Sequence, residues 1–324
     1  MNQRIRILAA LSCIVLWPAS SQAQVYPSRP ISIVVPFPAG GAADVIARPV
    51  AQRLTEGWGR PVVIENKPGA NTQIGTAYVA KATPDGYTLL ATADGTFVVN
   101  PYLYRKLPYD PDRDFAPISG LGVINQALVV HPSTPLQNVG DLVALAQAKR
   151  GDLNYGSWGV GSASHLSMGL LQAMTGVQLN AVQYKGAAPA LTDVIAGHIP
   201  MMFVSVGLMA PPWKAGQLRP LGIGSSERLV EFPELPTIAE TLPGFSATFW
   251  FGLFAPAGTP TNIIQKINVA VQGILAESSF REQFLAPNFY QSMIGSPEQL
   301  AQFIRSDADK WRRLIKDAKL TGDE

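Results

Sequence analysis

Short apolar runs rich in β-branched residues alternate along the chain with stretches whose apolar residues recur every three to four positions. In the segment 44–54, Ile46, Val50 and Leu54 fall on one helical face, directly after an apolar run at 31–35. Alternating strand and helix periods predict a parallel sheet covered by helices. The cycle continues with strands predicted at 61–65 and 87–92 and a helix at 74–82.

A second α/β block follows with the same alternation. The proline-rich stretch 230–244 interrupts it and is predicted to be an ordered surface loop. The strands of this block are predicted at 126–132, 153–157, 179–186, 199–205 and 218–225. Its helices are predicted at 138–149, 162–176 and 188–198.

Two apolar strands far apart in sequence share one layout. Each of 126–132 and 249–256 ends in a proline and is followed by a Thr-Pro pair before a helix. We expect these strands to be paired crossovers between two lobes. The segments 262–276 and 297–320 have helical periods and are predicted to return to the first lobe.

The first 23 residues have a different pattern. Arg4 and Arg6 precede an apolar stretch, which ends in the small residues of Ser21-Gln22-Ala23. This order is typical of a secretory signal peptide cleaved after Ala23, and the apolar stretch is shorter than the roughly 20 residues of a membrane span. We therefore expect residues 1–23 to be removed and the product to be exported to the periplasm.

Removal of this segment changes the charge and cysteine counts. Loss of its two arginines lowers the 25 basic residues to 23, equal to the 23 acidic residues, so a nucleic-acid partner is not indicated. Cys13 is the chain's one cysteine, so the mature protein is predicted to have no disulfide, thiolate metal site or cysteine nucleophile. The sequence indicates neither a cofactor nor a metal.

Three glycine-containing turns lead from a predicted strand into a predicted helix, at 36–44, 154–165 and 184–191. Free N–H groups at a helix start and the helix dipole favour anions, and ligands of open α/β sheets bind at such turns. The turns predict a clamp that closes on a small carboxylate. Any one turn alone is more often structural, although Trp158 within the second is a candidate for lining a pocket.

Signatures of catalysis are missing from the sequence. No serine has the G-x-S-x-G context, and His131, His165 and His198 lack metal-ligand spacing. Ser164 stands where a dinucleotide-binding loop would have its third glycine. An exported α/β enzyme acting on a small carboxylic acid and an exported scaffold with an empty cleft remain the alternatives to a binding protein.

Many blocks resemble, in order, the Bug-type receptors of tripartite tricarboxylate transporters. Among them are "VPFPAGGAADVIAR", "YGSWGVGSASHL" and "YKGAAPALTDVIAGHI", and the similarity runs from about Tyr26 to Lys319. The resemblance implies a type II periplasmic-binding-protein fold with two α/β lobes, a two-strand hinge and a ligand cleft between the lobes. It divides the chain into lobe 1 (24–124 and 249–324) and lobe 2 (125–248).

The resemblance also implies ligand contacts, position by position. Asp94 is unusual there, because its charge would repel a carboxylate; it is expected to bind an amine or hydroxyl of the ligand or to point away. The lobe 1 positions are Phe37, Ala39, Gly40, Gly41, Thr92, Ala93 and Asp94. The lobe 2 positions are Ser157, Gly161, Ser162, His165, Lys185, Gly186 and Ala187, and we add Trp158 and Ser205 as candidates.

The function implied is that of a non-catalytic receptor which captures an organic acid between its lobes. Its partners would be the membrane permease subunits of a tripartite transporter or a sensor kinase, and we expect a monomer. Phe37 and Trp158 would suit an aromatic or long-chain acid. Closure would be a hinge motion driven by better ligand contacts in the closed state.

Overall fold

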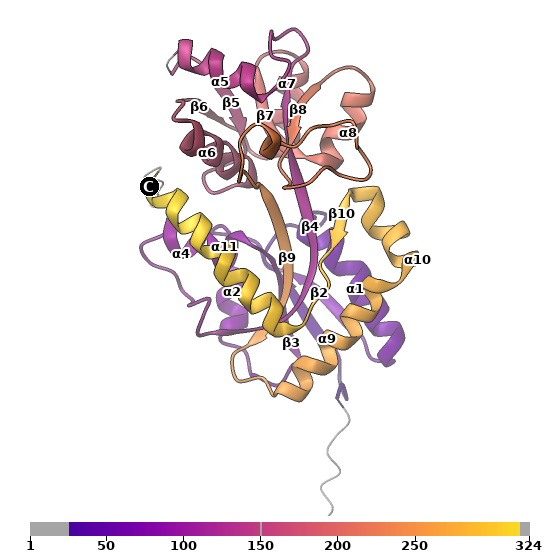
Figure 1. Ribbon diagram of the computed structural model, residues 1–324. Helices are drawn as coiled ribbons and strands as arrows, with labels where there is room; N and C mark the ends of the chain where they lie inside the picture. Colours follow the sequence, from indigo (N-terminus) through magenta and orange to yellow (C-terminus); the bar gives the residue numbers. More distant parts are fainter. Residues whose placement is uncertain (1–25, 150, 318–324) are drawn as a thin grey trace, which may run out of the picture.

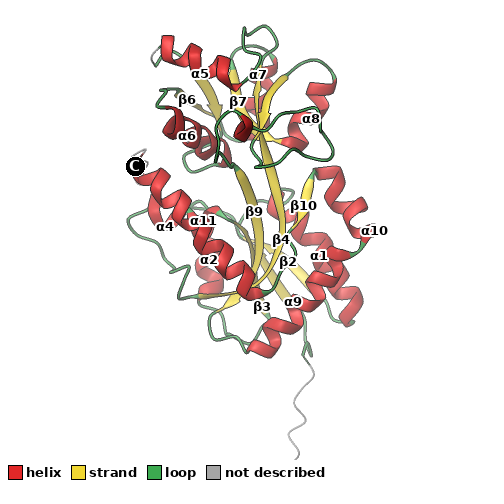
Figure 2. Ribbon diagram, in the orientation of Figure 1, coloured by secondary structure: helices red, strands yellow, loops and turns green. Residues whose placement is uncertain are grey.

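The computed structural model describes residues 26–149 and 151–317, so the predicted signal peptide lies outside the described residues. The chain forms two α/β lobes joined by long strands (Figure 1, Figure 2). The strands are β1 (Ile31–Val35), β2 (Val62–Asn66), β3 (Thr88–Ala93), β4 (Phe115–Val130), β5 (Asn154–Ser157), β6 (Asn180–Gln183), β7 (Met201–Ser205), β8 (Arg219–Ile223), β9 (Thr248–Pro256) and β10 (Tyr290–Ser292). The helices are α1 (Ala42–Trp58), α2 (Gln73–Ala80), α3 (Gly95–Val98), α4 (Asn100–Leu103), α5 (Val139–Ala148), α6 (Ala163–Thr175), α7 (Ala187–Ile195), α8 (Val206–Lys214), α9 (Thr261–Ala276), α10 (Ser278–Phe280) and α11 (Pro297–Asp317).

Lobe 1 is built on the strand order β2-β1-β3-β9-β4, with β10 paired to β4. The strands β1, β2 and β3 are parallel, as predicted, whereas β9 runs antiparallel to both β3 and β4. Helices α1 and α9 pack on one face of this sheet, and α2 and α11 lie on the other. Because both faces of the sheet are covered at β1 and β3, these two parallel strands are buried with little alternation.

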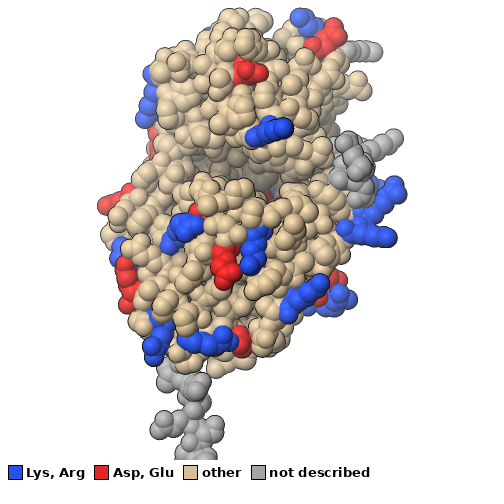
Figure 3. Space-filling model, turned by 180° about the vertical axis from the view of Figure 1, so that it is seen from behind, with Lys and Arg blue, Asp and Glu red and all other residues tan. Residues whose placement is uncertain are grey.

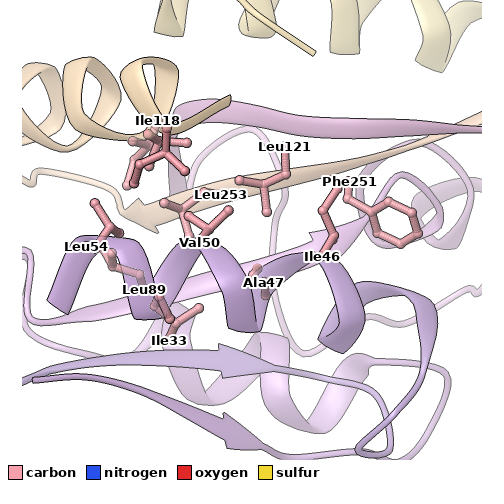
Figure 4. Close-up of a cluster of buried hydrophobic side chains, with 14 of the residues drawn as sticks. Ile33, Ile46, Ala47, Val50, Leu54, Leu89, Ile118, Leu121, Phe251 and Leu253 are labelled. Atoms are coloured by element: carbon pink, nitrogen blue, oxygen red, sulfur yellow. The ribbon is translucent and has the colours of Figure 1, made fainter. Parts of the chain in front are cut away.

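The core of lobe 1 lies between α1 and the sheet. Ile46, Val50 and Leu54 are buried against residues of β1, β3 and β9, among them Ile33 and Leu253 (Figure 4). The face predicted from the helical period is therefore the buried one. The packing of this face on the sheet fixes the start of α1 at the edge of the sheet that faces lobe 2.

Lobe 2 contains the end of β4 from Gln126 to Val130, flanked by antiparallel β7 and β8. Beyond β7, the short strands β5 and β6 add in parallel, with Gly156 paired to Met202. Helices α5 to α8 cover this sheet (Figure 2). Strand β7 lies between antiparallel β4 and parallel β5. The helices that follow the parallel strands β5, β6 and β7 are α6, α7 and α8, and they begin on the side that faces lobe 1.

Two strand segments form the hinge. In β4, Asn125 pairs with Thr248 of β9, and the next residue, Gln126, pairs with Ser205 of β7. The return crossing precedes β9, where the Ala247 N–H donates to the Gly224 carbonyl of lobe 2 at 2.8 Å. The predicted two-lobed α/β fold with a two-strand hinge is confirmed.

The hinge strand β4 begins eleven residues before the predicted strand 126–132. Pro117, Gly120 and Gly122 hid this extension, and the β4–β9 register shifts at both sites. A Cβ at Gly120 would lie 2.5 Å from Met293, so the two glycines reflect the close approach of β10 and the segment after it. Helix α1 continues through Pro49.

Candidate ligand-binding site

A cavity of about 660 Å³ lies between the two lobes. In the view from behind, a groove crosses the molecule between the lobes, and most charged side chains of this face lie outside it (Figure 3). No Lys, Arg or His is among the described residues that line the cavity, and Asp94 is the sole acidic residue there. An anion held here would therefore depend on neutral donors.

The first wall of the cavity is the start of α1. Ala42 and Ala43 line it, and the N-cap Gly41 brings no side-chain cap to the helix. Asp44 does not face a ligand: its carboxylate accepts hydrogen bonds from the Gly40 N–H at 2.9 Å and from the Arg48 side chain at 2.8 and 2.9 Å. Burial alone would raise the pKa of Asp44, but these bonds and one from Asn66 lower it. Asp44 therefore shapes the turn.

The second wall is the turn before α6. Ser162 caps this helix through the His165 N–H at 3.3 Å, and His165 Nδ1 accepts a hydrogen bond from the Gly161 N–H at 3.2 Å. Burial lowers the pKa of His165, which keeps its ring neutral as an acceptor. Gly161 has φ +76°, and a Cβ there would lie 2.8 Å from Leu103 of lobe 1. The turn thus touches the opposite lobe, and His165 holds its shape.

Two more helix starts complete the lobe 2 side. Ala187 opens α7 and Ser205 precedes α8; both line the cavity, and neither helix has a side-chain cap. Lys185 is exposed and does not line the cavity. Four helices of eight residues or more, α1, α6, α7 and α8, therefore begin at one cavity.

A polar network on lobe 1 was missed by the sequence reasoning. Asn71, Thr72, Thr96, Asn100 and Tyr104 line the cavity. Thr96 Oγ1 lies 3.0 Å from Thr72 Oγ1, and the Asn71 amide donates to Asn100 Oδ1 at 3.0 Å. Asn71 and Thr72 have positive φ of 46° and 74°. Such a φ is rare for a β-branched residue such as Thr72 and marks a strained loop. The Gly-Ala-Asn run at 69–71 was the available signal.

Asp94 lies at the cavity and is 4% exposed. Its Oδ1 accepts from the Gly95 N–H at 2.7 Å, whereas Oδ2 is buried with no hydrogen-bond partner. Desolvation raises the pKa of Asp94 well above its usual value, and the Asp307 carboxylate adds to this. The Asp307 carboxylate accepts a hydrogen bond from Trp250 Nε1 at 2.9 Å and pairs with Lys310 Nζ at 2.8 Å. These contacts favour a neutral Asp94.

The remaining walls are apolar. Phe37 and Trp158 line the cavity, as do Phe249 and Phe251 on the hinge strand β9. The two β9 phenylalanines are in the predicted crossover strand, but their direction could not be read from an all-apolar run. An apolar ligand body would therefore contact rings from both lobes.

The sequence-predicted positions fall into two groups. Those that line the cavity are Phe37, Ala93, Asp94, Trp158, Gly161, Ser162, Ala187 and Ser205. Those that do not are Ala39, Gly40, Gly41, Thr92, Ser157, His165, Lys185 and Gly186. Several of the second group support the first, as Thr92 does by bonding Thr96 at 2.7 Å.

Comparison with known proteins places this geometry in a family. The model of the tripartite tricarboxylate transporter family receptor matches residues 46–320. The chain belongs to this family. It is 35% identical to the protein BugT of Bordetella pertussis, over 92% of each chain. The receptor is therefore a periplasmic solute-binding protein, and its family and structural neighbours are binding proteins rather than enzymes.

Solved structures agree with the receptor's fold. R. palustris Rpa4515 with adipate has a TM-score of 0.81 and 35% identity, covering 91% of this chain and 99% of that one. MatC from Rhodopseudomonas palustris with bound malate has a TM-score of 0.76 and 31% identity, covering 90% and 100%. Within the described ranges, no helix of the receptor is both long and apolar enough to cross a membrane.

Proposed function

We propose that the receptor captures a small organic acid between its lobes and holds a carboxylate of that acid at helix N-termini. The observation that carries this proposal is the convergence of α1, α6, α7 and α8 on one cavity lined by no cationic side chain among the described residues. The first N–H groups of each helix lack partners within the helix, and the helix dipole adds partial positive charge. An anion bound at this point would accept hydrogen bonds from these N–H groups and would be stabilised by the helix dipoles.

The apolar walls define the rest of the ligand. Rings of Phe37, Trp158 and Phe249 would contact a carbon chain or an aromatic body, and a cavity of about 660 Å³ accommodates a molecule of this size. The relatives Rpa4515 and MatC, whose structures hold adipate and malate, support an organic acid as the ligand class.

The site fits stoichiometric capture without turnover. We infer that lobe 1 (24–124 and 249–324) and lobe 2 (125–248) close about the hinge, and that a membrane permease or a sensor kinase recognises the closed form. Residues 1–23 would be removed on export, and the mature receptor would be a monomer in the periplasm. Catalysis would need a nucleophile and a base in contact at the cavity. His165, in the first turn of α6, accepts a hydrogen bond from the Gly161 N–H instead.

A thermal-shift screen of residues 24–324 tests the proposal. The panel pairs aliphatic, aromatic and amino acids with their amide analogues, and mass spectrometry follows each compound for chemical change. A ligand at a hundred times its Kd adds about 2.7 kcal/mol to stability. We expect acids to raise the melting temperature and amides not to. Stabilisation by amides and acids alike would contradict the anion site, and conversion of a bound acid would favour the enzyme alternative.

A further inference from the structure

Gln126 occupies the position on β4 where the strand passes from one lobe to the other. The residue before it pairs with Thr248 at the start of β9, the strand that leads into lobe 1, and Gln126 itself pairs with Ser205 of β7 in lobe 2. Its carbonyl oxygen also accepts from the Gly224 N–H at 2.6 Å. The backbone of Gln126 is therefore held by strands on both sides, which fixes where its side chain begins.

The side chain of Gln126 lines the cavity, yet the residue is only 3% exposed. Its amide oxygen Oε1 is buried and has no hydrogen-bond partner. A buried polar atom without a partner costs free energy, and such atoms are few in folded proteins. A side chain of this kind, at the wall of a ligand cavity, indicates that its partner arrives with the ligand.

A second polar group stands beside this amide. Ser205 lies opposite Gln126 in the antiparallel pair, so both side chains project from the same face of the sheet, and both line the cavity. Ser205 directly precedes α8, but its hydroxyl does not cap that helix. Amide, hydroxyl and free helix start thus form a polar corner, which is bordered by the apolar Ile124 and Leu208.

We propose that this corner, formed by Gln126, Ser205 and the start of α8, is a subsite for a second polar group of the bound acid, and that Gln126 is the residue that selects for it. The inference rests on the proposed function, in which a carboxylate of the same acid lies at another helix start. The Gln amide offers N–H donors to a second carboxylate or its oxygen to a hydroxyl. A methyl group at the same place would leave the amide unpaired in an apolar cavity, which lowers affinity.

The neighbouring residue offers a matched control. Asn125 is 1% exposed and both polar atoms of its amide lack partners, but it does not line the cavity. Successive side chains of a strand point to opposite faces, so Asn125 shares the hinge with Gln126 but faces away from the ligand. A change at Asn125 therefore reports the effect of altering a hinge amide without altering the subsite.

Isothermal titration with adipate, 6-hydroxyhexanoate and hexanoate tests the assignment, because the three acids differ at one end of the same chain. We expect wild type to bind adipate or 6-hydroxyhexanoate about tenfold to a hundredfold more tightly than hexanoate. Gln126→Met should reduce this ratio to below about threefold and bind hexanoate at least as tightly as wild type, since it conserves volume and removes the amide that the methyl group leaves unpaired. Asn125→Leu should keep the wild-type ratio.

A second variant covers the case in which Gln126→Met does not fold. Gln126→Glu removes the N–H donors of the corner and, at a pH high enough to ionise the new buried carboxyl group, adds a negative charge there; adipate should then bind at least about tenfold more weakly, while 6-hydroxyhexanoate binds as in wild type. The assignment is overturned by an unchanged ratio in Gln126→Met, by equal weakening of all three acids in either variant, or by a wild type without preference. A wild type that binds none of the three also overturns it, and the wider acid panel then decides whether the proposed function fails too.

Discussion

Asp94 shows how far a single residue can be interpreted from sequence. The family resemblance placed it near the ligand, and its charge marked it as unusual beside an anion. The structure adds what spacing could not: Oδ2 is buried without a partner, and Asp307 from the distant helix α11 lies close enough to raise its pKa. Desolvation is the larger cause of the raised pKa, and the Asp307 carboxylate, more than 200 positions away in the sequence, adds to it.

Asp94→Asn should stabilise the protein at neutral pH. The pKa of Asp94 is raised in the folded state above its usual 3.8, so the folded state binds more protons between these two values and stability falls as pH rises through them. The amide removes this titration while conserving shape. We expect a higher melting temperature than wild type at pH 7 and a smaller difference near pH 4. Asp112→Asn, at an exposed position, should leave the melting temperature unchanged at both pH values. A lower melting temperature for Asp94→Asn at pH 7 would show that the carboxylate is stabilising.

Phe37→Ala and Trp158→Ala test the apolar walls. Each removes a ring that lines the cavity, and loss of a buried ring contact typically costs about 1–3 kcal/mol, or about fivefold to 150-fold in Kd. Aromatic and long-chain acids should lose most, and short acids least. Titrations in which both variants bind every acid as tightly as wild type would remove these rings from the site.

At the scale of elements, periodicity predicted most of the strands and longer helices, because burial of one helical face or of a whole strand leaves a direct imprint on composition. It failed where backbone geometry replaced composition. Pro117, Gly120 and Gly122 concealed the first part of β4, and the strained loop at 69–72 had no apolar pattern at all. Part of the unpredicted site belongs to the second of these segments, since Asn71 and Thr72 lie in that loop.

Alanine substitutions in the turn before α6 and in the middle of α6 should have opposite effects. Gly161→Ala places a methyl group 2.8 Å from Leu103 of lobe 1 at a positive φ, so we expect weaker binding of every acid by a similar factor, since the closed lobes are pushed apart. Gly169→Ala has no atom within 4 Å of the new Cβ and lies inside the helix, so it should stabilise by about 0.5–1 kcal/mol. Calorimetry and urea unfolding measure the two effects, and tighter binding by Gly161→Ala would refute the first.

At the scale of the whole molecule, the lobes meet at two places beside the hinge. Leu166 of α6 shares a buried cluster with Leu103 and Val99 of lobe 1. On the α8 side, the ring of Phe289 lies 5.2 Å from that of Phe232. The alternation of strands and helices and the layout of the crossovers predicted the two lobes from sequence. Contacts between the lobes depend on the angle at which they close, and no local sequence pattern predicts that angle.

Phe289→Ala should favour the open form. The substitution removes the ring contact with Phe232, which is worth about 0.5–1.5 kcal/mol beyond burial, without touching the cavity lining. Affinities for all acids should fall together by about twofold to tenfold, and small-angle scattering of the free protein should show a larger radius of gyration. A change in selectivity between acids, with no change in size, would contradict a role in closure alone.

The absence of Lys, Arg and His from the described cavity lining has a consequence for kinetics. Helix starts act over about one turn and are enclosed here by low-dielectric walls, and the predicted mature chain carries 23 basic and 23 acidic residues. Long-range steering of an acid toward the cleft should then be weak, and the association rate should change little with ionic strength. A receptor built this way would collect its ligand equally well in dilute and in salty surroundings.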